Sequence, residues 1–148
     1  IIQFSFIMYN LQTRSIERKH DFYINPPIDI PKIITEITGI TKETCVKKGV
    51  PIMLALDCFY ECYTMCNTVI AHNMAFDIEG LDWLGIELGR DQHTFCTMKG
   101  LTAPDQKWPR LEEVVAEFHI KTEGQAHRAE SDARTAGRVF IEMVRRGY

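Results

Sequence analysis

Two stretches decide the fold: Ala126-His127-Arg128-Ala129-Glu130-Ser131-Asp132 and, earlier in the chain, Ile70-Ala71-His72-Asn73-Met74-Ala75-Phe76-Asp77. Each pattern predicts a helix with an aspartate in its first turn, where the helix dipole favours a negative charge. Two such carboxylates brought together would form an oxygen-lined site for divalent cations. A histidine beside such a site indicates proton transfer, because its pKa lies close to neutral pH. The simpler alternative is that both aspartates only stabilise helix N-termini.

Length and composition favour one domain. The chain has 148 residues, of which 45% are hydrophobic, enough for one buried core, so we expect a single domain over residues 1–148. Its formal net charge of -3 gives no basic surface for long duplex nucleic acid, although a site for a few terminal nucleotides needs none. No apolar run approaches the ~20 residues of a membrane span. We expect a cytoplasmic protein without a membrane partner.

The five cysteines are an odd number without the spacing of a disulfide-rich secreted domain, which predicts reduced thiols. Cys58, Cys62 and Cys66 recur every four residues and would lie along one side of a helix. Three thiolates can contribute to a metal site, but no fourth ligand is close in the sequence. The pattern therefore favours small apolar side chains in a buried helix.

The first half of the chain predicts a hairpin followed by helices. The apolar run 1–9 is typical of a buried strand, and a short polar turn leads to a second strand over 15–24. Pro31 begins a short helix that Gly39 ends, and 38–41 forms a tight connection. Pro51 begins a longer helix with an apolar stripe at helical spacing. The stripe comprises Ile52, Leu56, Phe59, Tyr63 and Cys66.

In the second half, strands are expected at 68–71 and 94–98, with a helix from about Met74 between them. A loop with Pro104 then leads to helices over 111–118 and 129–146. The apolar residues expected on these three helices are Phe76, Leu81, Leu84, Leu88, Leu111, Val114, Val115, Phe118, Ala129, Ala133, Ala136, Phe140, Met143 and Val144. Strands mixed with helices predict an α/β sheet covered by helices.

Several polar or aromatic side chains have a structural interpretation that competes with a functional one. The Arg134, Arg138 and Arg145 row favours a solvated face paired with Glu130 and Glu142, with a nucleic-acid track as the alternative. Trp108, beside Pro109, favours packing, with base stacking as the alternative. His72 favours a structural role.

Several motifs resemble the DEDDh family of 3′→5′ exonucleases. His72-Asn73-x-x-Phe76-Asp77 and His127-x-Ala129-x-x-Asp132, in this order, are similar to the second and third motifs of that family. The segment 36–41 resembles the family's sequence before its second helix. Segments 96–99 and 108–109 resemble its loop between motifs. The resemblance covers essentially the whole chain.

The resemblance implies an RNase H-like α/β fold, with a central mixed sheet flanked by helices, that removes nucleoside 5′-monophosphates from 3′ ends of DNA or RNA. It implies two divalent cations, Mg²⁺ or Mn²⁺, with Asp132 and Asp77 as ligands and His127 as the acceptor of a proton from water. Asn73 would orient or bind phosphate. The turn at Gly39 and Ile40 would lie near the 3′ nucleotide and bear on recognition of a 2′-hydroxyl.

One family motif has no counterpart here. DEDDh enzymes carry Asp-x-Glu on a central strand that precedes the strand at 2–8, and those two carboxylates bridge both metals. We expect that strand to lie upstream of Ile1, because without it the strand at 2–8 would expose a long apolar edge.

Three functions from different classes remain open. The first is the metal-dependent exonuclease, and the second is an inactive module that binds single-stranded ends or a polymerase or repair partner. The third is a structural domain with no nucleic-acid role. An exposed sheet edge would also favour an oligomer.

Overall fold

The structure, a computed structural model, describes residues 1–88, 93–103 and 106–148. Its contacts divide the chain into two compact units, which are described separately below. The first unit comprises Ile1–Met65 and Gly124–Ala133, and the second comprises Cys66–Glu123 and Arg134–Tyr148. The single domain over residues 1–148 stays a prediction. Within the described ranges, no helix is long and apolar enough to cross a membrane.

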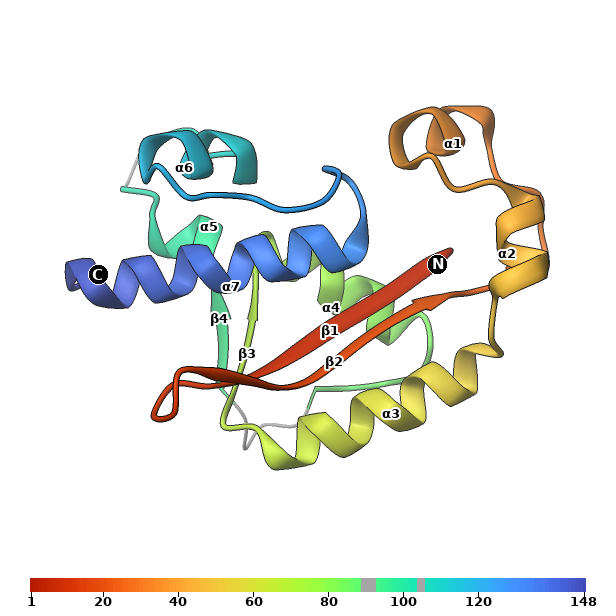
Figure 1. Cartoon of the computed structure of the whole chain (residues 1–148), viewed down its shortest axis with the longest axis horizontal. Coiled ribbons are helices and arrows are strands. Elements are labelled where there is room, and N and C mark those ends of the chain that lie inside the picture. Colours follow the sequence, from red (N-terminus) through yellow and green to blue (C-terminus); the bar gives the residue numbers. More distant parts are fainter. Residues whose placement is uncertain (89–92, 104–105) are drawn as a thin grey trace. The chain divides into compact units, whose positions relative to one another are not determined.

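A hairpin opens the first unit, as the sequence predicts. Strands β1 (Gln3–Asn10) and β2 (Ser15–Tyr23) pair antiparallel, with Gln3 opposite Tyr23 and a register shift between Met8 and Tyr9 (Figure 1). The four-residue turn between them fits an antiparallel connection. Aromatic side chains stabilise the pair, since Phe6 lies 4.9 Å from the cross-strand His20 ring, centroid to centroid.

Helix α1 (Lys32–Thr38) begins after Pro31 and ends at Gly39, as predicted. Gly39 has φ +69°, a left-handed conformation that a glycine adopts without steric cost. Helix α2 (Lys42–Lys48) was not predicted, because the sequence analysis treated 38–41 only as a connection. The Thr41 side chain accepts a hydrogen bond from the Thr44 N–H at 3.1 Å, and this N-cap begins α2.

Helix α3 (Ile52–Met65) follows Pro51, as predicted. Two members of its predicted stripe, Leu56 and Tyr63, are buried, and Ala55 and Cys62 are buried beside them. The buried side of α3 is therefore displaced from the predicted stripe toward smaller residues. Cys62 is one of the cysteines that the sequence analysis interpreted as apolar filling, and its burial agrees with that interpretation.

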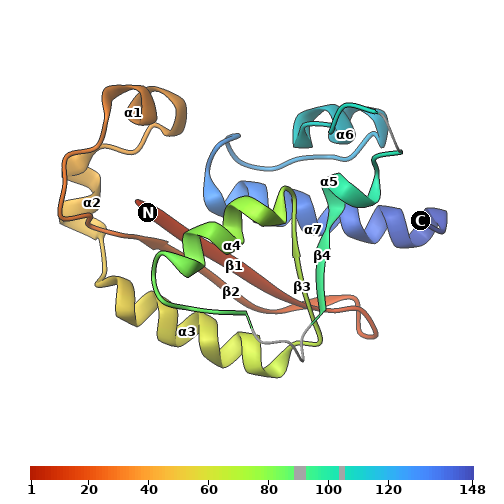
Figure 2. The ribbon, with the colours of Figure 1, turned by 180° about the vertical axis from the view of Figure 1, so that it is seen from behind.

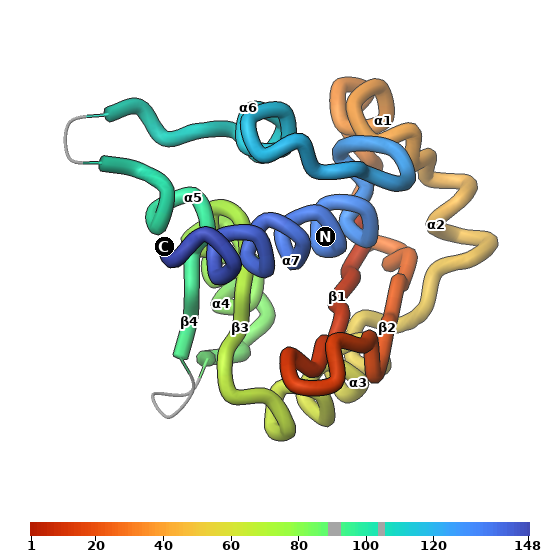
Figure 3. The backbone as a smooth tube through the Cα atoms, turned by 60° about the vertical axis from the view of Figure 1, so that its left-hand side comes forward, coloured from red at the N-terminus to blue at the C-terminus, as the bar shows by residue number. Residues whose placement is uncertain are grey.

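The second unit contains a parallel pair of strands. Strands β3 (Thr68–Ala71) and β4 (His93–Cys96) lie side by side and run in the same direction, with Ala71 opposite Cys96 (Figure 3). Helix α4 (Met74–Asp82) follows β3 and packs on both strands (Figure 2). The described strands thus form one antiparallel and one parallel sheet, in agreement with the predicted mixed α/β class.

Three expectations for this unit are corrected. The predicted strand 94–98 ends at Cys96, and Thr97–Gly100 forms a short helix, α5. Helix α4 ends at Asp82, so Leu84 and Leu88 follow it rather than belong to it. Phe76 is 73% exposed, because the side of α4 that carries it does not pack on β3 or β4. Pro104, expected in the next loop, lies outside the described residues.

Helices α6 (Leu111–Glu117) and α7 (Ala129–Arg146) agree with the predicted ranges. The core of the second unit forms where they meet and comprises Val114, Phe118, Val139 and Met143. Val139 is fully buried although the sequence analysis did not select it, and Val144, predicted to be buried, is 55% exposed. Both differences reflect a small rotation of the buried side of α7 relative to the predicted stripe.

The arginine row on α7 lies in ion pairs. Arg134 and Arg138 contact the Glu123 carboxylate at 3.3 Å and 2.8 Å, and Arg138 also donates to the Lys121 carbonyl. Arg145 pairs with Glu142 at 2.6 Å, as predicted. These pairs favour the solvated-face interpretation over a nucleic-acid track.

Candidate active site

The predicted site residues are divided between the two units. The first unit brings together His127, Asp132 and the turn at Gly39 and Ile40, whereas Asn73 and Asp77 belong to the second unit. Each unit therefore contains one of the two predicted carboxylates, in the first turn of a helix. One motif lies in each unit.

Asp132 lies in the first turn of α7 and is half-buried. Its backbone N–H donates to the Arg128 carbonyl at 2.9 Å, which fixes the start of the helix. Burial raises the pKa of Asp132, while a hydrogen bond from the His127 backbone N–H and the charge of the His127 side chain lower it. Asp132 and His127 are thus in direct electrostatic contact.

His127 and Asn73 share an unusual backbone conformation. Their φ angles are +63° and +65°, in the left-handed region that non-glycine residues seldom adopt. Each precedes the helix that carries its aspartate, and Asn73 is the N-cap residue of α4. Asparagine tolerates this region better than histidine does, so His127 carries more backbone strain. The side chain of His127 is exposed, as a proton acceptor for water must be.

Asp77 is the acidic residue in the first turn of α4. Although its side chain keeps contact with solvent, the surrounding protein atoms desolvate the carboxylate and raise its pKa to about 6. A hydrogen bond from its own backbone N–H acts in the opposite direction. A carboxyl group with a pKa so close to neutral is typical of functional sites.

Arg128 connects the predicted turn to the start of α7, a role that the sequence analysis missed. Its guanidinium donates to the Thr38 carbonyl at 3.3 Å and to the Tyr23 hydroxyl, and lies 5.4 Å from the Tyr23 ring centroid. Thr38 immediately precedes Gly39, which is exposed, while Ile40 is buried. Gly39 is therefore the accessible part of this turn, and Ile40 supports it.

A second missed residue, Gln3, caps α7. Its side-chain oxygen accepts a hydrogen bond from the Ala129 N–H at 3.0 Å, and its side-chain nitrogen donates to Asp21 at 2.7 Å. The first N–H groups of a helix have no partner within the helix, so Gln3 satisfies one of them. No local pattern links Gln3 to Ala129, because 126 positions separate them.

His72 has the structural role that its sequence context favours. Its Nε2 lies 3.0 Å from the Pro109 carbonyl oxygen, and its Nδ1 lies 2.9 Å from the Thr97 hydroxyl. A carbonyl only accepts hydrogen bonds, so Nε2 carries the proton. Burial lowers the pKa of His72, so the ring is neutral at pH 7 and Nδ1 accepts from Thr97.

The described part of the chain contains no group of three or more His, Cys, Asp or Glu side chains close enough together to hold a metal ion. Cys58 and Cys66 are partly buried, and Cys66 follows the end of α3, so the three thiols do not share one helix as predicted. Asp77 and Asp132 are hard oxygen ligands suited to Mg²⁺ or Mn²⁺, but two carboxylates alone do not fill an octahedral coordination shell. The remaining ligands would have to come from other groups, water or substrate.

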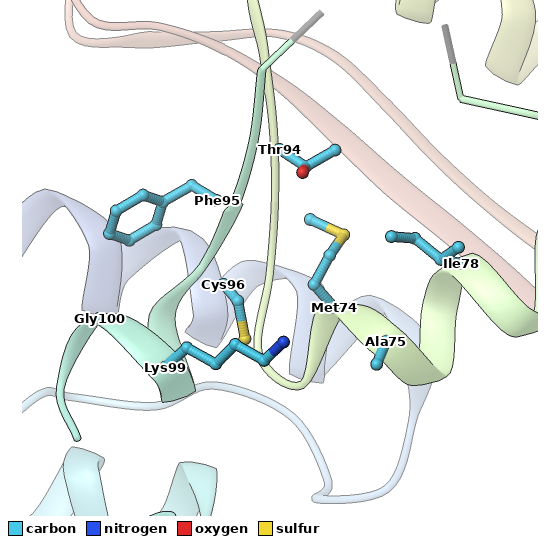
Figure 4. Close-up of a pocket in the computed structure, with 8 residues that line it drawn as sticks. All are labelled: Met74, Ala75, Ile78, Thr94, Phe95, Cys96, Lys99 and Gly100. Carbon is cyan, nitrogen blue, oxygen red and sulfur yellow. The ribbon is translucent and has the colours of Figure 1, made fainter. Parts of the chain in front are cut away.

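A cavity of about 490 Å³ lies within the second unit (Figure 4). Met74, Ala75 and Ile78 of α4 form one wall, and residues of β4 and α5, including Phe95 and Lys99, form the other. None of the predicted site residues lines this cavity, although Met74 and Ala75 belong to the motif that carries Asn73 and Asp77.

Solved structures of nucleases share this fold. Exonuclease X, solved in complex with 5′ overhanging duplex DNA, matches with a TM-score of 0.75 at 21% identity and covers 100% of this chain and 85% of its own. The nuclease domain of 3′hExo, a DEDDh family member bound to rAMP, matches with a TM-score of 0.75 at 15% identity, covering 99% of this chain and 82% of that one. The chain thus has the RNase H-like fold of these structures.

Sequence comparison identifies the family. The family model RNase_T, described as Exonuclease, matches residues 1–140, and the chain belongs to this family. The 3′-5′ exonuclease Snipper of Drosophila melanogaster is 28% identical over 180 aligned positions, covering 99% of this chain. The chain spans 62% of the length of Snipper. The resemblance to the DEDDh exonucleases is therefore confirmed.

Proposed function

We propose that this chain is a metal-dependent 3′→5′ exonuclease that hydrolyses phosphodiester bonds at single-stranded 3′ ends of DNA or RNA and releases nucleoside 5′-monophosphates. The observation that carries the proposal is the pairing of His127 with Asp132 at the start of α7. An exposed imidazole beside a half-buried carboxylate is suited to accept a proton from an attacking water molecule. Family membership agrees with nuclease chemistry.

Two divalent cations, Mg²⁺ or Mn²⁺, would lower the pKa of the attacking water and stabilise the developing charge on phosphate and leaving group. In this proposal Asp132 and Asp77 hold these cations through carboxylate oxygens. Deprotonation of Asp77, with its pKa of about 6, is required before it can act as a ligand. At pH 7 most of the Asp77 carboxyl groups are ionised.

The other predicted residues bind and orient the substrate. Asn73, exposed at the start of α4, offers a side-chain amide that can donate to a phosphate oxygen. Gly39 lets a terminal nucleotide approach the backbone closely, because it has no side chain. His127 takes the proton of water, and Arg128 holds the turn of Gly39 against the segment that carries His127.

A catalytically inactive module that binds single-stranded ends or a polymerase or repair partner is the second candidate. The lack of a complete ligand group within the described residues favours it. Such a module would keep nucleic-acid binding while losing the cations and hydrolysis.

The test is degradation of 5′-labelled single-stranded DNA and RNA by the purified full-length protein with Mg²⁺, Mn²⁺, Ca²⁺ or EDTA. We expect a ladder that shortens from the 3′ end with Mg²⁺ or Mn²⁺ and not with EDTA. Asp132→Asn should abolish the ladder and weaken Mn²⁺ binding, whereas Glu130→Gln, altered in the same helical turn, should do neither. Tight binding without degradation under any condition would replace the exonuclease by the inactive module.

A further inference from the structure

The segment Lys107–Arg110 presents an exposed tryptophan between two cationic side chains. Trp108 is 56% exposed, so the packing role that its sequence context favoured is not what the structure shows. Lys107 and Arg110 are exposed as well. An exposed indole between two positive charges leaves an aromatic face and two cations accessible to a ligand.

The backbone of this segment is held on both sides of one peptide group, the one that joins Pro109 to Arg110. His72 Nε2 donates to the Pro109 carbonyl at 3.0 Å, and the Arg110 N–H donates to the Glu113 carboxylate at 2.6 Å. The second bond also fixes the start of α6. Trp108 therefore projects from a backbone whose position is defined, so a ligand that stacks on it loses less conformational entropy than it would on a free loop.

The chemistry of the segment matches a single strand of nucleic acid. Every base has an apolar face that stacks on an indole ring whatever its identity, and nearby lysine and arginine side chains pair with the phosphates between bases. Arg110 also lies 3.6 Å from Glu112, but both side chains are largely exposed. Such a surface ion pair is weak, so phosphate can compete for the guanidinium.

The hydrogen bond from His72 to Pro109 also connects Lys107–Arg110 to the predicted site residue Asn73. His72, which holds the Pro109 carbonyl, is followed directly by Asn73, the N-cap residue of the helix that carries Asp77. One side chain thus joins the two segments. The connection lies wholly within the second unit.

The geometry points to Lys107–Arg110 as a contact for single-stranded nucleic acid, in which Trp108 stacks on a base and Lys107 and Arg110 bind phosphates. The contact rests on the proposed exonuclease function for its role, which is to hold the strand upstream of the nucleotide that is removed. It selects for the single-stranded form rather than for a base sequence.

The other tryptophan supplies a matched control. Trp83 follows α4 and is 83% exposed. The charged residues near it in the sequence, Glu79 and Asp82, are acidic, and no lysine or arginine flanks it. An exposed indole and a hydrogen-bonded backbone are therefore common to both positions, since the Trp83 N–H donates to the Glu79 carbonyl at 3.1 Å. Of the two tryptophans, only Trp108 has flanking cationic side chains. A phosphate strand would be repelled at Trp83.

The experiment measures oligonucleotide hydrolysis by the full-length protein and by three variants. We expect Trp108→Ala to raise KM for a single-stranded 12-mer about tenfold with little change in kcat, since stacking contributes to binding and not to bond cleavage. Trp108→Phe should recover most of the loss, and Trp83→Ala should match the unaltered protein. An unchanged KM in Trp108→Ala, while the unaltered protein degrades the 12-mer, would overturn the contact and leave the exonuclease intact.

Oligonucleotide binding is measured in a separate assay, so the contact at Trp108 can be tested even if the protein hydrolyses no oligonucleotide. The sequence has two tryptophans, so the Trp83→Phe variant keeps only Trp108 of the two. The fluorescence of Trp108 should then be quenched by a single-stranded 12-mer in Ca²⁺ or EDTA. Lys107→Ala should lower the slope of log affinity against log salt by about 0.7. Quenching without hydrolysis would support the contact in an inactive module, and absence of quenching would overturn it.

Discussion

The Arg128 guanidinium donates a hydrogen bond to the Thr38 carbonyl oxygen at 3.3 Å, across 90 positions of sequence. The same group donates to the Tyr23 hydroxyl. One side chain therefore joins the end of β2, the end of α1 and the segment that carries His127. A planar group with several fixed donors can do this, whereas a lysine ammonium cannot hold the same geometry.

Replacement of Arg128 should disturb substrate positioning more than folding. We expect Arg128→Lys to lower kcat/KM for a single-stranded oligonucleotide about tenfold, because the turn at Gly39 loses its connection to the His127 segment. Steady-state kinetics and a thermal unfolding curve would separate the two effects. Arg18→Ala, which removes an exposed pair with Glu61 at 3.3 Å, is the control and should change neither. Equal losses of activity in both variants would rule out a positioning role for Arg128.

His127 should be needed for turnover and not for metal binding. We expect His127→Asn to lower kcat by a factor of about 10² to 10⁴, since it removes the proton acceptor. Asparagine adopts the left-handed φ of +63° readily, so the backbone should stay in place.

The matched control for this change is His119→Asn. His119 is also an exposed histidine with a positive φ, +54°, but it lies outside the motif. Its replacement should leave kcat unchanged, and calorimetric Mn²⁺ binding should survive in both variants. Near-normal turnover of His127→Asn at pH 7 would show that another group accepts the proton.

Asp77 should titrate near neutral pH when no metal is bound. Desolvation raises its pKa to about 6, so the fold favours the neutral carboxyl group over the carboxylate. Its favourable contribution to stability is therefore present below the unfolded-state pKa of 3.8 and is lost as the pH rises through about 6.

Two measurements check this titration. The carboxyl carbon of Asp77 should show an NMR titration midpoint near pH 6 in EDTA. Asp77→Asn should raise the free energy of unfolding at pH 7 in EDTA, and the difference should disappear at pH 3.5. A midpoint near 4 would contradict the desolvation of this group, while a midpoint displaced downward by Mn²⁺ would support its role as a ligand.

His72 should make the second unit sensitive to acid. Burial lowers its pKa below the ordinary value of 6.5, so the unfolded chain binds a proton more readily than the folded one. The stability that depends on neutral His72 is fully present above pH 6.5 and is lost as the pH falls through the lower folded-state pKa.

The variant that tests this role is His72→Ala. It leaves the Pro109 carbonyl without its donor, and the Thr97 hydroxyl keeps only the Ala71 carbonyl, at 3.4 Å. The loss should cost about 1–3 kcal/mol in urea unfolding at pH 7.5. This loss of unfolding free energy should be smaller at pH 5, because protonation of His72 already destabilises the unaltered protein there. A cost independent of pH would mean that His72 does not titrate between these values.

Much of the secondary structure follows from local sequence. The bounds of α7 and β3, the hairpin and the end of α1 at Gly39 are as predicted, because turns, caps and apolar periodicity act over a few residues. The two motifs, in their order and with the neighbouring segments, also resembled the correct family, which the family model confirms. Helix α2 was missed although its N-cap, Thr41, is visible in the sequence.

The sequence by itself determined the candidates for the chemistry, His127, Asp132 and Asp77, since their types and spacing suit proton transfer and metal binding. Only the tertiary structure decided which side chains fix the segments around these candidates. Arg128 reaches Thr38, Gln3 caps α7, and His72 holds Pro109. These hydrogen bonds join positions 90, 126 and 37 residues apart. The physical reason is that periodicity and capping report on neighbours within a turn or two, whereas these contacts form only when distant segments pack together.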